Sequence, residues 1–536
     1  MDTRNRIPRV AYFCMEYGLN EEFKIYSGGL GILAGDILKS ARDLEMPLIG
    51  IGILWRKGYT DQLIASDGTP YDVYPENHYD FLEDTGVTVN VDVRGENIAC
   101  KVWKTDKYGN VPLYLLDASI SGDKGSWITE KLYGGTSQDR IAQEIVLGIG
   151  GVRALRALDI DIDIYHFNEG HAVLAATELI REKIENIGLS FKEAWDATRK
   201  EIVFTTHTPV PEGNEVHGHD LLKYMGAYNS LTFEEMETLG GDTFNMTVAG
   251  LRLSYLANGV AELHGVTARR MWKNISESAP IISITNGVHP GTWQDAKIRQ
   301  AYEDDEDLWD PHIEAKKRLL KEIQNRTGAH LNPDNIVIGF ARRAAPYKRS
   351  DLIFYNRDLI KPLLDKGEVQ LVFSGKAHPN DGAGKDIVKR IVAMSKRYPN
   401  SVVFLENYDM KIGKLLTRGC DVWLNNPRRP MEASGTSGMK AAMNGVLNLS
   451  VLDGWWPEGC EHGINGWQIG DKYEGLGQDE YDAQSLYRTL FEEVLPTYYK
   501  DRTKWMSMMR SSIDMSHQFS AHRMVKEYYQ LMYDKM

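Results

Sequence analysis

The chain has 536 residues, of which 42% are hydrophobic and 26% charged, a length that predicts two to four globular domains. Its formal net charge of −13 argues against nucleic acid as the main partner, so an anionic substrate must meet a local basic cluster. No apolar run approaches the roughly 20 residues of a membrane span, and the four cysteines lack CxxC spacing, which predicts a cytoplasmic protein without a membrane segment or metal site.

Short apolar, β-branched runs alternate with longer amphipathic segments, a rhythm typical of α/β folds with parallel sheets. Helices are predicted over 171–186 and 190–201, the second with Ser190 and Glu193 in capping-box spacing. Buried strands are predicted over 9–15, 47–55, 162–167, 201–207, 280–286, 335–341, 369–375, 401–407, 421–427 and 445–451.

Two helical segments bear on the domain organisation. The charged segment 303–335 separates two groups of strands and is expected to bridge two domains. The amphipathic C-terminal segment lies far from the last strand in sequence. From the residues alone, it could pack across the joint between the domains or lie on the second domain.

Polar or glycine-rich clusters follow nearly every predicted strand. Loops favour Gly, Pro, Asn and Asp in general, but His, Arg, Lys and Glu also recur at these positions. Ligands of open α/β sheets bind beyond the carboxyl ends of the strands, so these clusters are candidate site residues.

The first glycine cluster, "YSGGLGILAGDILKSARDL" at 26–44, lies between a predicted strand and a helix. Gly28, Gly29 and Gly31 would let the backbone approach a ligand, although a tight turn explains them equally well. The spacing does not match the GxGxxG dinucleotide fingerprint.

A basic cluster follows the strand at 335–341. Arg342, Arg343, Lys348 and Arg349 lie within eight residues, which predicts a phosphate-binding segment in this acidic protein. A solvated basic surface is the alternative.

Histidines and carboxylates supply further candidates. His171 and His207 each lie just past a predicted strand, which favours a functional role for the pair. A glycosidase would need two carboxylates flanking a bond, and Glu169, Glu212, Glu432 and Asp453 are available.

The stretch "EASGTSGMKAAMNG" at 432–445 places a lysine, Lys440, behind a glycine-rich loop at the start of a predicted helix. A helix start suits an anion and not a cation, so Lys440 is either an ordinary surface lysine or serves a bound anionic group.

Taken together, these segments resemble the α-glucan (glycogen, starch, maltodextrin) phosphorylase family of glycosyltransferases. "EASGTSGMKAAMNG" is similar to the family's pyridoxal-phosphate lysine motif, and "RRAAPYKR" to its phosphate-binding segment. "SGGLGILA", "TTHTP" and "TNGVHPGTW" resemble its glycine-rich loop, active-site segment and NG-P-W turn, in the family's order. Arg342 departs from the pattern, because many members have lysine there.

The resemblance implies a GT-B fold, with two Rossmann-like domains facing across a deep cleft. The expected parts are an N-terminal glucan domain at 1–305, a C-terminal domain with the cofactor and phosphate sites at 306–515, and a crossover helix at 516–536 packing toward the N-terminal domain.

The resemblance also implies a reaction: reversible, retaining phosphorolysis of α-1,4-glucan by inorganic phosphate, releasing α-D-glucose 1-phosphate. The cofactor would be pyridoxal 5′-phosphate on Lys440, with its 5′-phosphate as proton shuttle. Maltodextrin or glycogen would be the partner, and a homodimer is left open.

Roles for individual residues follow from the same resemblance. The cofactor would be contacted by Arg342, Tyr408, Gly435, Thr436, Ser437 and Lys440. Catalysis would involve His207, Arg343, Lys348 and Lys440. Substrate would be bound by Gly29, His171, Asn286, Glu432, Ser434 and Gly435.

Two other functions fit parts of the sequence. A nucleotide-sugar glucan synthase of the same fold would share the glycine-rich loop, and a non-catalytic glucan-binding protein would share the fold. The Lys440 motif weighs against the first, and the intact set of basic and cofactor residues weighs against the second.

Overall fold

The computed structural model describes residues 6–210 and 213–534. These described residues form two compact units: the first comprises 6–59, 74–210, 213–285 and 521–534, and the second comprises 60–73 and 286–520. Both are built on α/β sheets, as the alternation of apolar runs and amphipathic segments predicts.

The first unit contains a nine-stranded sheet, counted within the described residues, in the order β13-β12-β9-β8-β1-β2-β7-β6-β5. From β7 through β12 the strands follow the 3-2-1-4-5-6 order of a doubly wound fold, with the order reversing between β1 and β8. The strands are β1 (Val10–Phe13), β2 (Leu48–Ile53), β5 (Glu83–Val93), β6 (Glu96–Thr105), β7 (Leu113–Asp117), β8 (Ile164–Asn168), β9 (Ile202–Thr205), β12 (Leu256–Gly259) and β13 (Ile281–Ser283). A separate antiparallel pair joins β10 (Val216–His217) to β11 (Phe244–Asn245).

One edge of this sheet adds antiparallel strands to the parallel sheet that the sequence predicted. The β5–β6 and β6–β7 pairs are antiparallel, and the register places Val91 opposite Ile98. Alternate residues of β5 are buried and exposed, because this hairpin covers the core on one side only.

The second unit contains a six-stranded sheet, counted in the same way, in the order β16-β15-β14-β17-β18-β19. Its pairs are parallel and it repeats the 3-2-1-4-5-6 order, which reverses between β14 and β17. The strands are β14 (Ile336–Ala341), β15 (Val369–Ser374), β16 (Val402–Leu405), β17 (Val422–Asn425), β18 (Leu447–Val451) and β19 (Gly466–Ile469).

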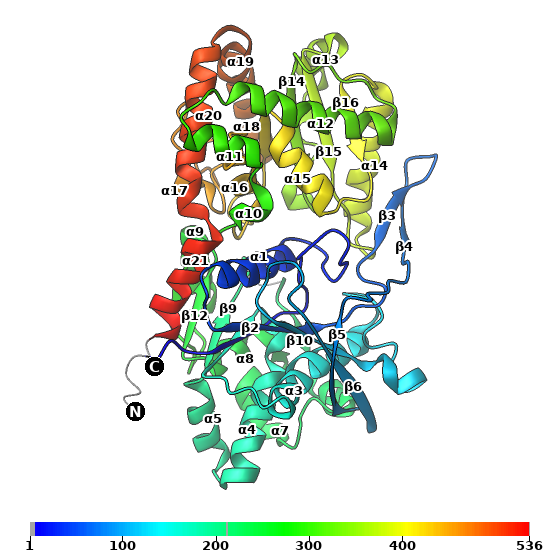
Figure 1. Cartoon of the computed structure of the whole chain (residues 1–536), viewed down its shortest axis with the longest axis vertical. Helices are drawn as coiled ribbons and strands as arrows, with labels where there is room; N and C mark the ends of the chain where they lie inside the picture. The colour runs from blue at the N-terminus through cyan, green and yellow to red at the C-terminus, as the bar shows by residue number, and fades with distance from the viewer. Residues whose placement is uncertain (1–5, 211–212, 535–536) are drawn as a thin grey trace. The chain divides into compact units, whose positions relative to one another are not determined.

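Both faces of this second sheet are buried. Ile336 and Ile338 of β14 join one apolar cluster, whereas Val337 between them joins another. Helices α12 and α15 cover the face of Val337 (Figure 1). A strand buried on both faces needs a continuous apolar run, which explains why β14 to β18 were predictable.

Helices pack on both sheets. In the first unit they are α1 (Gly29–Asp43), α2 (Ser137–Ile145), α3 (Gly151–Ala157), α4 (Leu174–Ile187), α5 (Phe191–Arg199), α6 (His219–Met225), α7 (Phe233–Gly240), α8 (Met246–Leu253), α9 (Glu262–Trp272) and α21 (Ala521–Tyr528). In the second they are α10 (Pro290–Trp293), α11 (Ala296–Glu303), α12 (Trp309–Thr327), α13 (Arg357–Lys366), α14 (Gly382–Arg397), α15 (Met410–Gly419), α16 (Ser437–Ala442), α17 (Trp456–Gly459), α18 (Gln478–Thr489), α19 (Leu495–Lys500) and α20 (Arg502–Ser516). The predicted capping box of α5 is confirmed.

The units and the predicted domain boundaries differ at two points. The hairpin of β3 (Asp61–Ile64) and β4 (Pro70–Val73) belongs to the second unit, where Gln62 bonds both backbone groups of Ala377. The chain passes between the units at 285–286, so α12 is an integral helix of the second unit and not a bridge.

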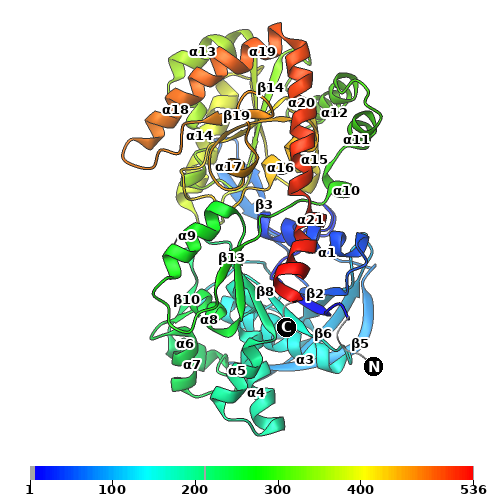
Figure 2. The same cartoon turned by 90° about the vertical axis from the view of Figure 1, so that its left-hand side faces the viewer.

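The C-terminal helix α21 packs within the first unit, beside α1 (Figure 2). Beyond it, the Tyr533 hydroxyl lies 2.6 Å from Nδ1 of His166 on β8. No helix within the described residues is both long enough and apolar enough to cross a membrane.

Candidate functional site

The parallel strands of each sheet reverse their order at one point, and several candidate residues follow the strands at that point. In the first unit, Glu16 follows β1, and Asn168 and Glu169 lie at the end of β8. In the second unit, Arg342 follows β14, and the segment leading to Glu432 follows β17. Such reversal points are where doubly wound sheets bind ligands.

The glycine-rich loop of the first unit is held by the buried carboxylate of Glu16. Its oxygens accept hydrogen bonds from Ser27 N at 2.5 Å, Gly28 N at 3.2 Å and the Tyr133 hydroxyl at 2.9 Å. Burial raises the pKa of Glu16, and these hydrogen bonds oppose that effect. Glu16 therefore fixes the backbone that leads into α1.

The reason for a glycine differs among the three glycine positions of this loop. A Cβ on Gly31 would lie 2.6 Å from Glu16 Oε2, so packing requires glycine there. A Cβ on Gly28 or Gly29 would meet nothing within 4 Å. Packing therefore does not explain the last two, and close approach of a ligand to the backbone would.

At the end of β8, Glu169 adopts a φ of 71°, which is uncommon for a residue other than glycine. Its Oε2 accepts from the backbone N–H of His207 at 2.8 Å. Burial raises the pKa of Glu169 to about 7. The strained backbone thus aims a carboxyl group at the loop that follows β9.

The imidazole of His207 is fixed as a neutral ring. Its Nε2 lies 2.5 Å from Asn168 Oδ1, and Asn168 Nδ2 donates to Cys14 Sγ. Because Oδ1 can only accept, Nε2 carries the proton and Nδ1 remains an acceptor. Packed protein on its inner sides, followed by His264, lowers the pKa of His207 to about 3, although part of the ring is still accessible.

In the second unit, two cations converge on one buried carboxylate. Arg342 Nη2 and Lys348 Nζ each donate to Glu432 Oε2 at 2.5 Å. Burial would raise the pKa of Glu432, but the two cations outweigh it and lower the pKa to about 2. This brings together three residues that the sequence placed in one site.

The loop after Glu432 is locked to the loop after β18. Asp453 accepts from the backbone N–H groups of Glu432 at 2.9 Å and Gly454 at 2.8 Å, and Ser434 O accepts from Trp455 N at 3.0 Å. Burial, followed by the charge of Glu432, raises the pKa of Asp453 to about 7. Asp453 therefore positions the loop and is not a free acid–base group.

Gly435 leaves room beside the cations. It has a φ of 86°, and a Cβ there would lie 3.4 Å from Arg342 Nη2. Arg342 Nη1 and Ser434 Oγ are buried and make no hydrogen bond to any described residue. A buried guanidinium with an unsatisfied donor is costly, and an anionic ligand would satisfy it.

Lys440 is buried in α16, with its Nζ 3.8 Å from the ring centroid of Trp293. A Cβ on Gly413 would lie 2.7 Å from the Tyr408 hydroxyl and 3.7 Å from Trp293. Gly413 therefore adjoins both the Tyr408 hydroxyl and the Trp293 ring that Lys440 contacts. Lys440 is not the surface lysine that the sequence left as an alternative.

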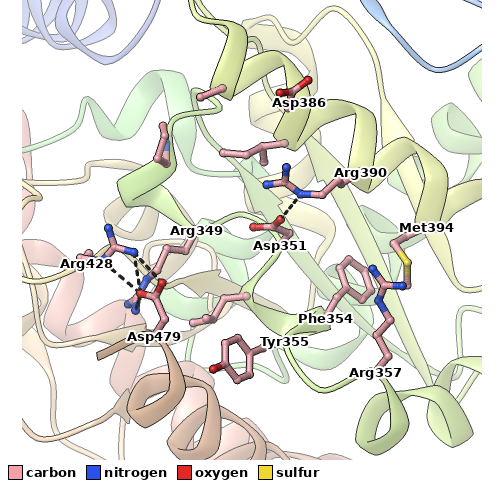
Figure 3. Close-up of a pocket in the computed structure, with 14 residues that line it drawn as sticks. Arg349, Asp351, Phe354, Tyr355, Arg357, Asp386, Arg390, Met394, Arg428 and Asp479 are labelled. Atoms are coloured by element: carbon pink, nitrogen blue, oxygen red, sulfur yellow. Dashed lines mark hydrogen bonds and ion pairs between the residues drawn. The ribbon is translucent and has the colours of Figure 1, made fainter. Parts of the chain in front are cut away.

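Arg349 corrects the predicted basic cluster. Its buried guanidinium donates to Asn426 O and Pro427 O at 2.8 Å and pairs with Asp479 and Asp482. Figure 3 shows Arg349 beside Asp479. Both line a cavity of about 420 Å³, which shares no lining residue with the loop 432–445 that carries Lys440. All three guanidinium nitrogens of Arg349 bind groups of the fold, so Arg349 ties two strand-end loops together.

The other predicted residues lie as follows. Arg343 is exposed, Asn286 is buried, and Ser437 Oγ accepts from Trp423 Nε1 at 3.1 Å. Thr436 immediately precedes α16. Gly29 and His207 belong to the first unit, as does His171, whereas Glu212 lies outside the described residues.

Sequence-based prediction missed two positioning residues, Glu16 and Trp293. It named Asp453 as a candidate carboxylate but missed that Asp453 binds backbone N–H groups. Glu16 and Trp293 lie in "CMEYG" and "TNGVHPGTW", clusters that follow predicted strands, so the strand-end pattern was the available signal. Their partners are distant in sequence, which no local pattern indicates.

The amino-acid sequence is similar to one known family model and to several named proteins. The family model described as carbohydrate phosphorylase matches residues 151–229 and 264–458. The chain is 40% identical to a maltodextrin phosphorylase of Thermococcus litoralis, over 98% of this chain and 70% of that protein. It is 36% identical to a glycogen phosphorylase of Mycobacterium tuberculosis, with the same coverage, and 35% identical to one of Aquifex aeolicus, over 98% of this chain and 86% of that protein.

Proposed function

The chain belongs to the carbohydrate phosphorylase family, and we propose that it catalyses reversible, retaining phosphorolysis of α-1,4-glucan. The C1–O4 bond of a terminal glucosyl unit breaks, and a C1–O bond to phosphate forms on the same face. The proton of hydrogen phosphate ends on O4 of the shortened glucan. The products are α-D-glucose 1-phosphate and a glucan with one unit less.

The observation that carries this proposal is the convergence of Arg342 and Lys348 on Glu432 beside Gly435. Phosphate needs clustered cations in an acidic protein, and a sugar needs a fixed hydrogen-bond acceptor. This cluster supplies both in one loop pair. The choice of an α-glucan as the substrate rests on the names of the relatives from Thermococcus, Mycobacterium and Aquifex.

Pyridoxal 5′-phosphate fits the residues of the second unit. The unsatisfied Nη1 of Arg342 suits a phosphate, and Lys440 lies buried over Trp293. Gly413 adjoins both Trp293 and the Tyr408 hydroxyl. We propose that Lys440 holds the cofactor and that Gly435, Thr436, Ser437 and Arg342 hold its phosphate. When bound, the cofactor's phosphate would exchange a proton with the substrate phosphate.

The protein's own groups would then bind and orient the reactants. Lys348 and Arg343 would bind inorganic phosphate together with the Gly29 backbone, which packing leaves open. Glu432 and Ser434 would hold glucosyl hydroxyls, and His207 would accept one at Nδ1. Hydrogen bonds that strengthen as charge develops on the sugar are the ones that accelerate the reaction.

The remaining proposed substrate contacts are Asn286 and His171, one in each unit. The GT-B arrangement of the two units across a cleft, a homodimer and a cytoplasmic location are proposals that follow from the family resemblance. Light scattering of the purified protein tests the dimer, and cell fractionation tests the location.

Borohydride reduction followed by peptide mapping tests the cofactor assignment. We expect a pyridoxyl adduct on Lys440 and no adduct in Lys440→Ala, which should abolish phosphorolysis while keeping the far-ultraviolet circular dichroism unchanged. Lys414→Ala, also a helical lysine of the second unit, is the matched control.

The same preparation distinguishes the alternative function. Nothing in the comparisons favours a nucleotide-sugar synthase. The proposed function would be overturned if the protein elongated glucan from a nucleotide-glucose, carried no adduct on Lys440, and released no glucose 1-phosphate when inorganic phosphate is supplied.

A further inference from the structure

A second cluster of chemically active side chains lies in the first unit, between α2 and the short β10–β11 pair. It consists of Glu144 near the end of α2, and of Glu215 and His217 on either side of Val216. One ligand atom from each lies within 4.8 Å of the others. The proposed phosphorolysis gives none of these three residues a role.

Two of these side chains are buried without a hydrogen bond. Glu144 is 0% exposed and His217 4% exposed. Both carboxylate oxygens of Glu144 and the Nε2 of His217 lack a hydrogen-bond partner among the described residues. Buried polar atoms are nearly always satisfied, so three such atoms converging on one point indicate a ligand.

The spacing of the atoms identifies the kind of ligand. His217 Nε2 lies 3.3 Å from Glu144 Oε2 and 3.5 Å from Glu215 Oε1. Ligands at about 2.0–2.1 Å in a tetrahedral site are about 3.4 Å from one another. The two distances therefore match the edges of such a site, whereas the atoms do not hydrogen-bond one another.

The surroundings support the same assignment. Arg140 Nε lies 3.1 Å from Glu215 Oε1, and its guanidinium stacks 4.6 Å over the ring of Tyr133. Carboxylates that bind metals are commonly hydrogen-bonded by a second group in this way. His171 Nε2 lies 3.9 Å from Glu215 Oε2 and offers a further nitrogen.

Charge is balanced better with a cation than without one. The carboxyl groups of Glu144 and Glu215 lie together, and Arg140 pairs with Glu215. A divalent cation between them would neutralise both carboxylates.

We propose that Glu144, Glu215 and His217 bind one divalent transition-metal cation of the zinc class, with three protein ligands and an open fourth position. The bound ion would tie α2 to the segment between β9 and β10, which carries His207. It would thus brace a loop of the first unit, separately from the cofactor chemistry of the second unit.

Calorimetry of the full-length protein, after dialysis against a chelator, tests this proposal with Zn²⁺ as the probe and Mg²⁺ as the comparison. We expect one Zn²⁺ per chain and much weaker binding of Mg²⁺, since a histidine ligand favours zinc. Glu144→Gln and His217→Gln should weaken Zn²⁺ binding by about 100-fold or more, because even indirect ligand losses cost about 10–100-fold.

The matched control is His462→Gln, since His462 also lies beside a carboxylate, 2.9 Å from Glu493, but at an exposed position. Equal Zn²⁺ affinity in the wild type and in His217→Gln, or no Zn²⁺ binding, would overturn the proposal. Cobalt substitution in the wild type tests it without a variant: visible bands of four-coordinate Co²⁺ that Zn²⁺ abolishes support the site, and their absence rejects it.

Discussion

The ammonium group of Lys348 donates a hydrogen bond to the carboxylate of Glu432 at 2.5 Å, and both side chains are almost fully buried. Arg342 binds the same oxygen, so one carboxylate offsets two cations. This contact joins the loop after β14 to the loop that leads to Lys440. The two strand-end motifs are therefore one electrostatic unit.

Glu432→Gln should lower both stability and activity. The amide leaves Arg342 and Lys348 buried without their anion, a loss that typically costs about 3–5 kcal/mol. Urea denaturation at pH 7 measures the change. Glu314→Gln removes an exposed partner of Lys297 and should change the urea midpoint far less. Equal effects of the two substitutions would contradict the buried-pair interpretation.

The same carboxylate predicts how stability responds to acid. The cations lower the pKa of Glu432 from 4.5 to about 2, so its charge adds stability above pH 4.5. That contribution is lost as the pH falls from 4.5 toward 2. The wild type should therefore lose more stability than Glu432→Gln over this range, as measured by denaturation at a series of pH values.

Gly29→Ala and Gly31→Ala should separate function from packing. A Cβ at position 29 meets no atom within 4 Å, so the variant should keep the wild-type melting temperature. Its phosphorolysis should fall by about 10-fold or more if phosphate approaches that backbone. Gly31→Ala places a Cβ 2.6 Å from Glu16 and should lower the melting temperature. Unchanged activity in Gly29→Ala would remove the loop from the proposed site.

Much of the fold was predictable because buried parallel strands need continuous apolar runs. β1, β2, β9 and β13 to β18 all lie within the predicted runs, and β8 extends one residue beyond its run. The hairpin of β5 and β6 escaped prediction because alternate residues face outward and lower its apolar content. β12, "LANG", is too short and too polar to be recognised without its neighbours.

The site was predictable as a set of motifs but not as a set of contacts. The strand-end pattern located Arg342 and Lys348, and the glycine-rich loop before a helix located Lys440; the structure adds which groups they touch. Arg349 shows the limit of this approach. It lies next to Lys348 in sequence, yet its guanidinium serves the fold, since local charge density cannot reveal which way a side chain points.

Between pH 5 and pH 8, the Glu169→Gln variant should lose less stability than the wild type. Burial raises the pKa of Glu169 from 4.5 to about 7, so folding favours its protonated form. The resulting stability is fully present below pH 4.5 and is lost as the pH rises through 7. Urea midpoints at pH 5 and pH 8 should differ less in the variant than in the wild type. Glu185→Gln, on the exposed side of α4, should leave that difference unchanged.

Asp421→Asn should destabilise the second unit strongly. Asp421 is buried between α12 and β14, where it accepts from Lys316 Nζ at 2.6 Å, His312 Nε2 at 2.8 Å and Val337 N at 2.7 Å. Burial would raise its pKa, but Lys316 and then His312 outweigh that effect and lower it. The asparagine amide cannot neutralise Lys316, which leaves a buried unpaired ammonium and a cost of about 3–5 kcal/mol. Asp365→Asn, which breaks the exposed pair with Lys361 on α13, should change the urea midpoint far less. Similar urea midpoints for the two variants would mean that the three contacts of Asp421 do not stabilise the second unit as proposed.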